Sequence, residues 1–346
     1  MTAGQAREAA RRWIAEEARG IAGFCGAYTA GSTNWLDDDA EMSVTSDVDV
    51  MVLVDDGMAA GRRKFRYGGA LLEVTYLRKE QFALSEQVLR DYRVAPGFQT
   101  AKVLVDPSGE LTRLRAEVSP NFAKWRWVRE RCAHARREVA GKLESAENAA
   151  VQEDQAMACL FAAGITTHIL LTSGMKNPTV RTRYVALREL LAEYGCGDFH
   201  EALLELLGAA RIDGERARRR LAALVRAFDA AKDAMKTAFV FSADISDCCR
   251  ANAIDGSAEM IERGLHREAM FWIGVTHCRC RKILVRDAPG EVARKFEDGF
   301  RELIGDLGLA DGVAVRRRCA DIERMLPRVW DVAEKIMEWN GEIERE

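Results

Sequence analysis

Hydrophobic and polar positions alternate in residues 47–54 with the two-residue period of a β-strand. Four valines would share one face of this strand, namely Val48, Val50, Val52 and Val54. The opposite face would carry Asp47, Asp49, Met51 and Leu53. This pattern predicts a strand that buries one face in the core and carries two carboxylates on the other. Asp55, Asp56 and Gly57 then predict a turn.

Other β-prone runs in the first third of the chain predict three further strands, over residues 23–32, 69–77 and 101–106. Helical patterns cover residues 1–20 and 79–93. Strands and helices thus alternate in this part of the chain. We therefore predict a mixed-sheet domain over residues 1–115.

The pattern changes beyond residue 118, where long amphipathic segments rich in Ala, Leu, Glu and Arg follow one another. Ser119 and Pro120 are expected to cap and open the first helix of this region. Further helices are expected over residues 151–173, 178–194, 214–237, 257–285, 291–307 and 315–339. The predicted fold class is therefore α+β, with the sheet domain followed by an all-α helical domain, residues 116–346, built as one or two bundles.

Composition and charge narrow the classes of protein and partner. The chain has 346 residues, of which 48% are hydrophobic, which suffices for two domains with cores of their own. The net charge is −3, and neither side of residue 115 has the basic excess that binding a long nucleic acid requires. Residues 1–20 lack the apolar centre of a signal peptide, and no uninterrupted apolar run has the length of a membrane span. We therefore expect a cytoplasmic protein with no membrane partner, whose nine scattered cysteines are reduced thiols.

The carboxylates of the predicted sheet indicate metal chemistry. Asp47 and Asp49 project from the same face of one strand, so they can share one or two hard divalent cations such as Mg²⁺. Glu73 lies on another predicted strand and could reach the same cluster. Two carboxylates suffice for Mg²⁺ when the phosphates of a substrate complete its coordination shell.

Gly31 and Ser32 follow the first predicted strand and indicate an anion site. A glycine lets the backbone approach a phosphate closely, and the next backbone N–H and hydroxyl can donate to its oxygens. Each of these motifs is common by chance. Their order, in which a Gly-Ser turn precedes a strand with two aspartates and a strand with a third carboxylate, is more specific.

This order of motifs, TAGSTNW, TSDVDVMVLV and then LLEVTYL with Glu73, resembles the nucleotidyltransferase superfamily that includes DNA polymerase beta and the aminoglycoside nucleotidyltransferases. The resemblance covers residues 20–115. It implies that Asp47, Asp49 and Glu73 bind Mg²⁺, and that Gly31 and Ser32 bind the triphosphate of a nucleotide, with ATP as the expected co-substrate. An acceptor hydroxyl would attack the α-phosphorus, with Asp49 and Glu73 as catalytic residues and Glu73 as either a metal ligand or the base.

One departure from the family concerns the loop between Ser32 and Asp47, which is longer than usual. This loop carries four acidic residues that leave an alternative set of metal ligands open: Asp37, Asp38, Asp39 and Glu41.

The helical region also resembles, loosely, a helix pair of the aminoglycoside adenylyltransferases, over residues 147–195. By that resemblance, Asp154 or its neighbour Glu153 would bind the acceptor, and Lys176 would bind the nucleotide phosphates. A zinc site at His277, Cys278 and Cys280 is not expected, because Cys278 and Cys280 would point to opposite sides of a helix.

The sequence therefore predicts a Mg²⁺-dependent nucleotidyltransferase that moves a nucleoside monophosphate, AMP from ATP, onto a hydroxyl of a small polar acceptor such as an aminoglycoside-like compound. Two alternatives stay open. One is nucleotidyl modification of a protein or tRNA, and the other is a regulatory module that binds nucleotide without transferring it.

Overall fold

The structure is a computed structural model, and it describes residues 1–43, 45–55 and 61–345. It divides into two compact units, each described by itself below. The sheet unit comprises Met1–Arg131 and Glu342–Glu346, and the helical unit comprises Cys132–Gly341. The division falls after the expected boundary at residue 115, because helix α4 (Glu110–Val118) packs against other helices of the sheet unit. The turn residues Asp56 and Gly57 lie outside the described residues.

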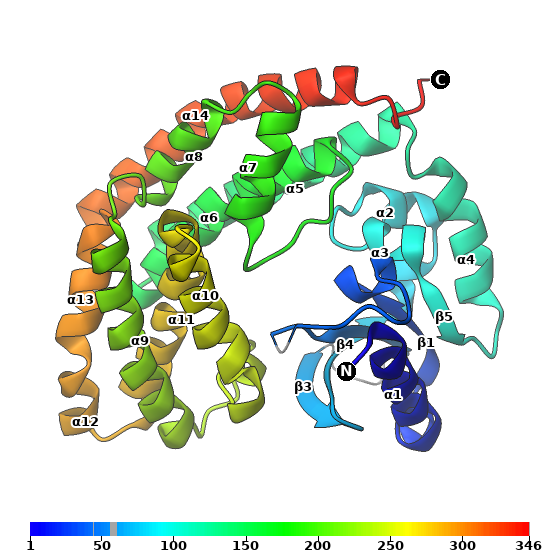
Figure 1. The fold of residues 1–346 in the computed structure, drawn as a ribbon, viewed down its shortest axis with the longest axis horizontal. Coiled ribbons are helices and arrows are strands. Elements are labelled where there is room, and N and C mark those ends of the chain that lie inside the picture. The colour runs from blue at the N-terminus through cyan, green and yellow to red at the C-terminus, as the bar shows by residue number, and fades with distance from the viewer. Residues whose placement is uncertain (44, 56–60, 346) are drawn as a thin grey trace. The chain divides into compact units, whose positions relative to one another are not determined.

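The sheet unit contains one mixed five-stranded sheet, which confirms the predicted α+β class (Figure 1). Its strands are β1 (Phe24–Ala30), β2 (Val48–Val54), β3 (Gly61–Tyr67), β4 (Ala70–Arg78) and β5 (Lys102–Val105). Their order across the sheet is β3-β4-β2-β1-β5. Strand β2 pairs parallel with β4 and antiparallel with β1, while the edge strands β3 and β5 pair antiparallel with β4 and β1.

Strand β3 is absent from the sequence prediction. Its sequence, GRRKFRY, holds four basic residues in seven and lacks the apolar alternation of the other strands. Such a composition suits an edge strand, where charged side chains remain near water and discourage pairing with another chain.

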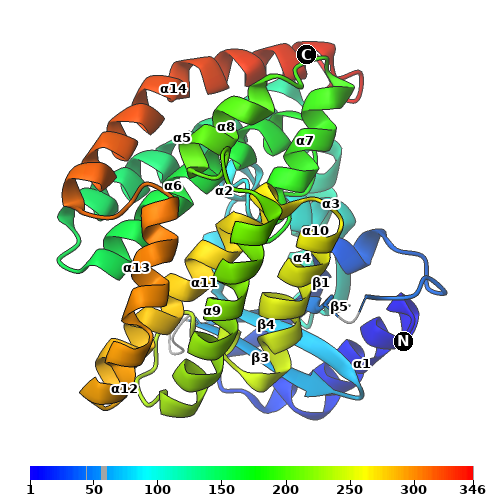
Figure 2. The same cartoon turned by 60° about the vertical axis from the view of Figure 1, so that its left-hand side comes forward.

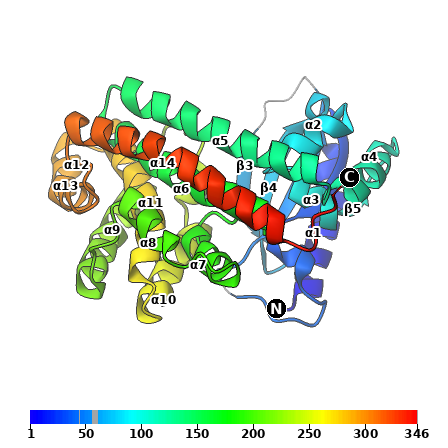
Figure 3. The same ribbon diagram turned by 90° about the horizontal axis from the view of Figure 1, so that it is seen from above.

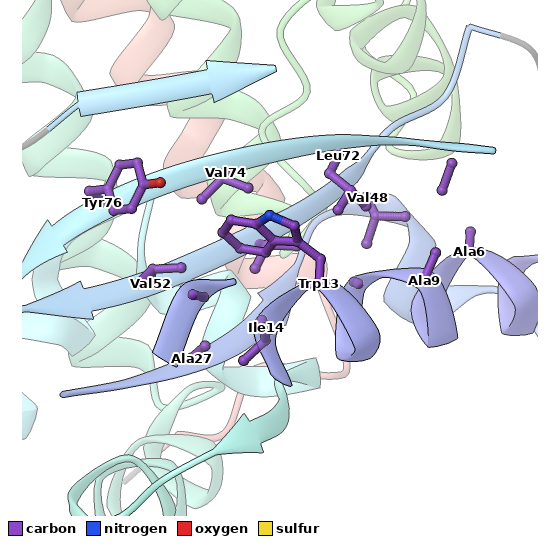
Figure 4. Packing of buried hydrophobic residues seen from close by; sticks show 14 of the residues in the cluster. Ala6, Ala9, Trp13, Ile14, Ala27, Val48, Val52, Leu72, Val74 and Tyr76 are labelled. Atoms are coloured by element: carbon purple, nitrogen blue, oxygen red, sulfur yellow. The ribbon is translucent and has the colours of Figure 1, made fainter. Parts of the chain in front are cut away.

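One face of the sheet is covered by helix α1 (Ala3–Glu16). The predicted valine row of β2 lies in this core and is fully buried, and Trp13 of α1 packs among the same side chains with 1% of its surface exposed. Figure 4 shows Trp13 beside Val48, Leu72 and Val74. The predicted inward orientation of the valines is thus confirmed, and Asp49 of β2 belongs to the opposite face.

The opposite face of the sheet is covered over part of its length by short helices. These are the 3₁₀ helix η3 (Lys79–Phe82), α2 (Ser85–Arg90), α3 (Ala95–Thr100) and α4. Leu53 of β2 and Tyr28 of β1 are buried beneath them. The helix expected at Ser119 and Pro120 is instead a single 3₁₀ turn, η4 (Ser119–Asn121), and the long helix α5 (Trp125–Asn148) begins after it.

The helical unit contains no β-strand among its described residues. After α5 its helices are α6 (Gln152–Ser173), α7 (Arg183–Glu193), α8 (Phe199–Leu207), α9 (Gly214–Ala234), α10 (Gly256–Glu262), α11 (His266–Asp287), α12 (Gly290–Lys295), α13 (Glu297–Asp306) and α14 (Gly312–Trp339). Short turns, η5 (Ser242–Asp244), η6 (Asp247–Cys249) and the π-helical η7 (Ala251–Asp255), connect α9 to α10. Helices α9, α10 and α11 lie side by side (Figure 2), and α14 runs along α6 (Figure 3).

Several predicted helices differ from those of the structure. The segment predicted as one helix over residues 257–285 is divided into α10 and α11, because Gly264 between them adopts a φ of 78° that helical residues do not have. The segment predicted over residues 291–307 is divided at Phe296 into α12 and α13, and helix α8 was not predicted.

Helix α6 is the one described helix that is long and apolar enough to cross a membrane. However, 83% of its most apolar window is buried inside the protein, where it packs against α7, α8, α11 and α14. The central helix of a bundle has the same composition as a membrane span, since both are apolar on all sides.

All nine cysteines lie within the described residues, where their side chains are thiols. Cys278 and Cys280 are buried in α11 together with His277. The His277 ring lies 5.7 Å from the ring of Phe300, and burial lowers the pKa of His277 from 6.5 to about 3. This histidine is therefore neutral in the folded protein at neutral pH.

This neutral histidine predicts a pH-dependent stability of the helical unit. The unfolded chain protonates His277 below pH 6.5, whereas the folded chain resists protonation down to about pH 3. Stability should therefore be complete above pH 6.5 and decrease as the pH falls through this window, by about 2 kcal/mol at about pH 5. Urea unfolding at several pH values should show a shallower loss for His277→Phe than for the wild type. If the free energy of unfolding fell equally with pH in both proteins, His277 would not be the cause of the pH dependence.

Candidate active site

Three carboxylates converge where β2 and β4 pair. The parallel register places Asp49 directly opposite Glu73, and Asp47 immediately precedes β2. One oxygen from each of Asp47, Asp49 and Glu73 lies within 4.8 Å of the others. Within residues 1–43, 45–55 and 61–345, no other three His, Cys, Asp or Glu side chains bring their ligand atoms this close together. The structure thus brings together the three residues that the sequence predicts as metal ligands.

The chemistry of these ligands suits a hard divalent cation. All three offer carboxylate oxygens, and all three are partly buried, so the ligands are held in place but remain open to water or substrate on one side. Mg²⁺ prefers such oxygens and usually keeps several coordination positions for waters and phosphates. Asp47, Asp49 and Glu73 would therefore fit one or two Mg²⁺ ions.

Gly31 lies against the carboxylate of Asp49. It ends β1, whose last residue Ala30 pairs with Asp49 across the sheet. Its backbone has φ 75° and ψ −170°, a conformation that is essentially limited to glycine. A Cβ atom at this position would lie 1.7 Å from Oδ2 of Asp49, so a side chain here would also displace the Asp49 carboxylate. Ser32 follows as an exposed residue that opens the 3₁₀ helix η2 (Ser32–Trp35).

Helix α1 anchors the long loop after Ser32. The buried guanidinium group of Arg7 donates from Nη1 to the backbone carbonyl of Thr33 and from Nη2 to Oδ1 of Asp38. The hydrogen bond from Arg7 lowers the pKa of the Asp38 carboxyl. The backbone N–H of Gly4 donates to the carbonyl of Asp38 at 2.9 Å, and the N–H of Ala3 donates to that of Ala40 at 2.9 Å. The loop is therefore tied to the first turn of α1.

The acidic residues of this loop lie outside the carboxylate group. Asp37, Asp38, Asp39 and Glu41 are all exposed, and none joins Asp47, Asp49 and Glu73 in the arrangement described above. The geometry therefore favours the three sheet carboxylates over the alternative set of ligands.

Two basic side chains from the edge strand β3 contact the carboxylates. Lys64 pairs with Glu73 in the strand register, and its Nζ lies 2.8 Å from Oδ2 of Asp47 and 2.5 Å from Oε2 of Glu73. Arg62 donates from Nη1 to Oε1 of Glu73 at 2.9 Å. Neither residue is among the site residues predicted from the sequence. The pattern that could have revealed them is the spacing of Arg62, Lys64 and Arg66 at every second position, which places them on one strand face.

The carboxylate of Asp49 has the least favourable surroundings of the three. Its desolvation in the protein, followed by the neighbouring charges of Asp47 and Glu73, raises the pKa of Asp49 well above its usual value. Lys64 and Arg62 act in the opposite direction but do not cancel the effect. A strongly perturbed carboxyl group beside two others is typical of functional sites.

The remaining predicted site residues belong to the helical unit. Both oxygens of Asp154 accept bonds from Nζ of Lys282 at 2.7 Å, and the neighbouring Glu153 is buried. Lys176 lies 3.2 Å from Glu193 in an exposed ion pair. The roles of Glu153 and Asp154 in acceptor binding, and of Lys176 in phosphate binding, stay predictions.

The chain has little similarity to known proteins. No protein-family model matches the chain, and no curated protein sequence matches it. Among solved structures, a nucleotidyltransferase-like protein from Exiguobacterium sibiricum 255-15 is similar, with 13% sequence identity and a TM-score of 0.31. The match covers 75% of this chain and 91% of that chain. A similarity at this identity and TM-score does not show the function of this chain.

The close approach of Gly31 to Asp49 can be tested by comparing alanine substitutions at two glycines with positive φ. Gly31 has φ 75° and ψ −170°, whereas Gly109 has φ 74° and ψ 1°, a left-handed conformation that costs other residues less, and a Cβ at Gly109 would meet no atom within 4 Å. Mn²⁺ binding therefore reports the contact with Asp49 separately from the backbone strain. We expect Gly109→Ala to cost about 1 kcal/mol, and Gly31→Ala to cost about 3 kcal/mol and to weaken Mn²⁺ binding as well. Thermal unfolding and Mn²⁺ titration would measure the two effects. Equal losses of stability with unchanged Mn²⁺ binding would show that Gly31 does not position Asp49.

Proposed function

We propose that this protein is a metal-dependent nucleotidyltransferase. It moves a nucleoside monophosphate, AMP from ATP, onto a hydroxyl group of a small polar acceptor. The observation that carries this proposal is the convergence of Asp47, Asp49 and Glu73 beside the glycine turn at Gly31. Carboxylates for a divalent cation and an adjacent backbone site for phosphate are the two parts that phosphoryl transfer requires of a protein.

The residues of the site divide this chemistry between them. Asp47, Asp49 and Glu73 would hold Mg²⁺, which supplies electrostatic stabilisation for charge on the reacting phosphate. The backbone at Gly31 and Ser32 would bind the triphosphate, because at Gly31 no side chain keeps the phosphate oxygens away. Loop residues 33–40 would keep this turn in place through their bonds to α1.

The transfer itself exchanges one phosphate ester bond for another. The acceptor oxygen forms a bond to the α-phosphorus, the bond from this phosphorus to the α,β-bridging oxygen breaks, and pyrophosphate leaves with the bonding electrons. The proton of the acceptor hydroxyl passes to a carboxylate or to water. Glu73 accepts bonds from Arg62 and Lys64 at its two oxygens, so either role proposed for it, metal ligand or base, requires one of these cations to move away.

The residues proposed to bind the acceptor and the nucleotide phosphates belong to the helical unit. Asp154 or Glu153 would contact a cationic acceptor, such as an aminoglycoside-like compound, and Lys176 would contact the phosphates. These assignments rest on the loose resemblance of residues 147–195 to aminoglycoside adenylyltransferases. An acidic contact favours a basic acceptor, because opposite charges attract over the distances of a binding site.

The proposed function predicts that removing one carboxylate charge abolishes turnover. Asp49→Asn should lower ATP-dependent pyrophosphate release by about 100-fold or more, since it removes a ligand of the reacting centre while keeping the shape of the side chain. Asp39→Asn is the matched control, because it makes the same chemical change at an exposed loop residue. Pyrophosphate release would be measured with Mg²⁺, ATP and a panel of hydroxylated acceptors. If Asp49→Asn retained wild-type turnover, the assignment of the active site would be wrong.

A further inference from the structure

The ammonium group of Lys64 lies between two of the three carboxylates. Its Nζ contacts Asp47 at 2.8 Å and Glu73 at 2.5 Å, and only 8% of its side chain is exposed. These are oxygens that a divalent cation would use. A metal ion and the ammonium group therefore compete for the same ligands.

We propose that Lys64 couples metal binding to nucleotide binding. Without a nucleotide, the ammonium group holds Asp47 and Glu73 and weakens the binding of a divalent cation. When a triphosphate binds, its oxygens become new partners for Lys64, which releases the carboxylates to the metal. This inference rests on the proposed function, because it assumes a metal and a triphosphate at the same site.

The charges of the cluster support this coupling. The three carboxylates, when ionised, exceed the two cations Arg62 and Lys64 by one negative charge. A divalent cation alone would reverse the sign of the cluster, and a triphosphate alone would make it strongly negative. A nucleoside triphosphate carries about four negative charges, so a triphosphate that binds together with two divalent cations returns the site to the single net negative charge of the empty cluster. In a partly buried site such imbalances are costly, because water screens the charges less than at the surface.

The side chain of Lys64 suits this exchange better than an arginine would. The lysine ammonium is a compact charge on a flexible four-carbon stem, so it can move between partners without rearranging the strand that carries it. Arg62 has a planar guanidinium group, which forms an ion pair with Glu73. Lys64 contacts both Asp47 and Glu73, so its movement frees two ligands at once.

A binding experiment with Mn²⁺ tests this coupling without measuring turnover. Free Mn²⁺ would be quantified by electron paramagnetic resonance for the wild type, Lys64→Gln and Arg63→Gln, each with and without α,β-methylene ATP. Arg63→Gln is the matched control, because it removes one positive charge from the same strand at an exposed residue whose guanidinium group lies over the Phe65 ring.

Without nucleotide, we expect Lys64→Gln to bind Mn²⁺ about tenfold more tightly than the wild type, and Arg63→Gln to resemble the wild type. The nucleotide analogue should raise the Mn²⁺ affinity of the wild type clearly more than that of Lys64→Gln. Thermal unfolding would report whether the variant folds. If Lys64→Gln is destabilised, Lys64→Met supplies a second neutral variant, and Mn²⁺ should raise its midpoint of unfolding more than it raises that of the wild type.

Two negative outcomes separate this inference from the proposed function. Equal Mn²⁺ affinity of the wild type and Lys64→Gln, both binding the ion at the carboxylates, would overturn the role of Lys64 and leave the metal site intact. Absence of Mn²⁺ binding in the wild type and Lys64→Gln, with and without the nucleotide analogue, would overturn the proposed function and this inference together.

Discussion

The parallel pairing of β2 with β4, in the register that places Asp49 opposite Glu73, is the constraint on which the site depends. Side chains alternate between the faces of a strand, so a slip of one residue would turn one of these carboxylates into the core. The hydrophobic face prevents that slip, because the valines of β2 are buried together with Leu72 and Val74 beneath Trp13. The packing against α1 therefore fixes the position of carboxylates on the other side of the sheet.

That register has an electrostatic cost, because it brings three carboxylates within 4.8 Å of one another in partly buried positions. The edge strand β3 offsets much of the repulsion by presenting Arg62 and Lys64 to the same face. The remaining cost is visible at Asp49, whose pKa stays raised despite both cations. Groups that repel one another in this way are retained where function requires them, since apolar residues would pack there at lower cost.

The sequence could predict the parts of this arrangement that depend on local pattern. The alternation in residues 47–54 predicts β2 and its two faces, and Gly31 is recognisable because a strand ends there in Gly-Ser. Strand β3 could not be predicted from hydrophobicity, because an edge strand that serves as a counter-charge has little apolar alternation. The anchoring of the long loop by Arg7 could not be predicted either, because a contact between residues distant in the chain leaves no periodic pattern in the sequence.

A lysine also occupies the residue proposed to bind the acceptor. Asp154, the residue predicted to contact a cationic acceptor, is bound through both oxygens to Lys282. A cationic ligand would have to replace this lysine, just as a metal would have to replace Lys64 at Asp47 and Glu73. Since an isolated partly buried carboxylate is costly, a lysine partner stabilises the site before its ligand arrives. Because its stem is flexible and its charge compact, lysine can give up that place more readily than the rigid, multiply bonded guanidinium of arginine.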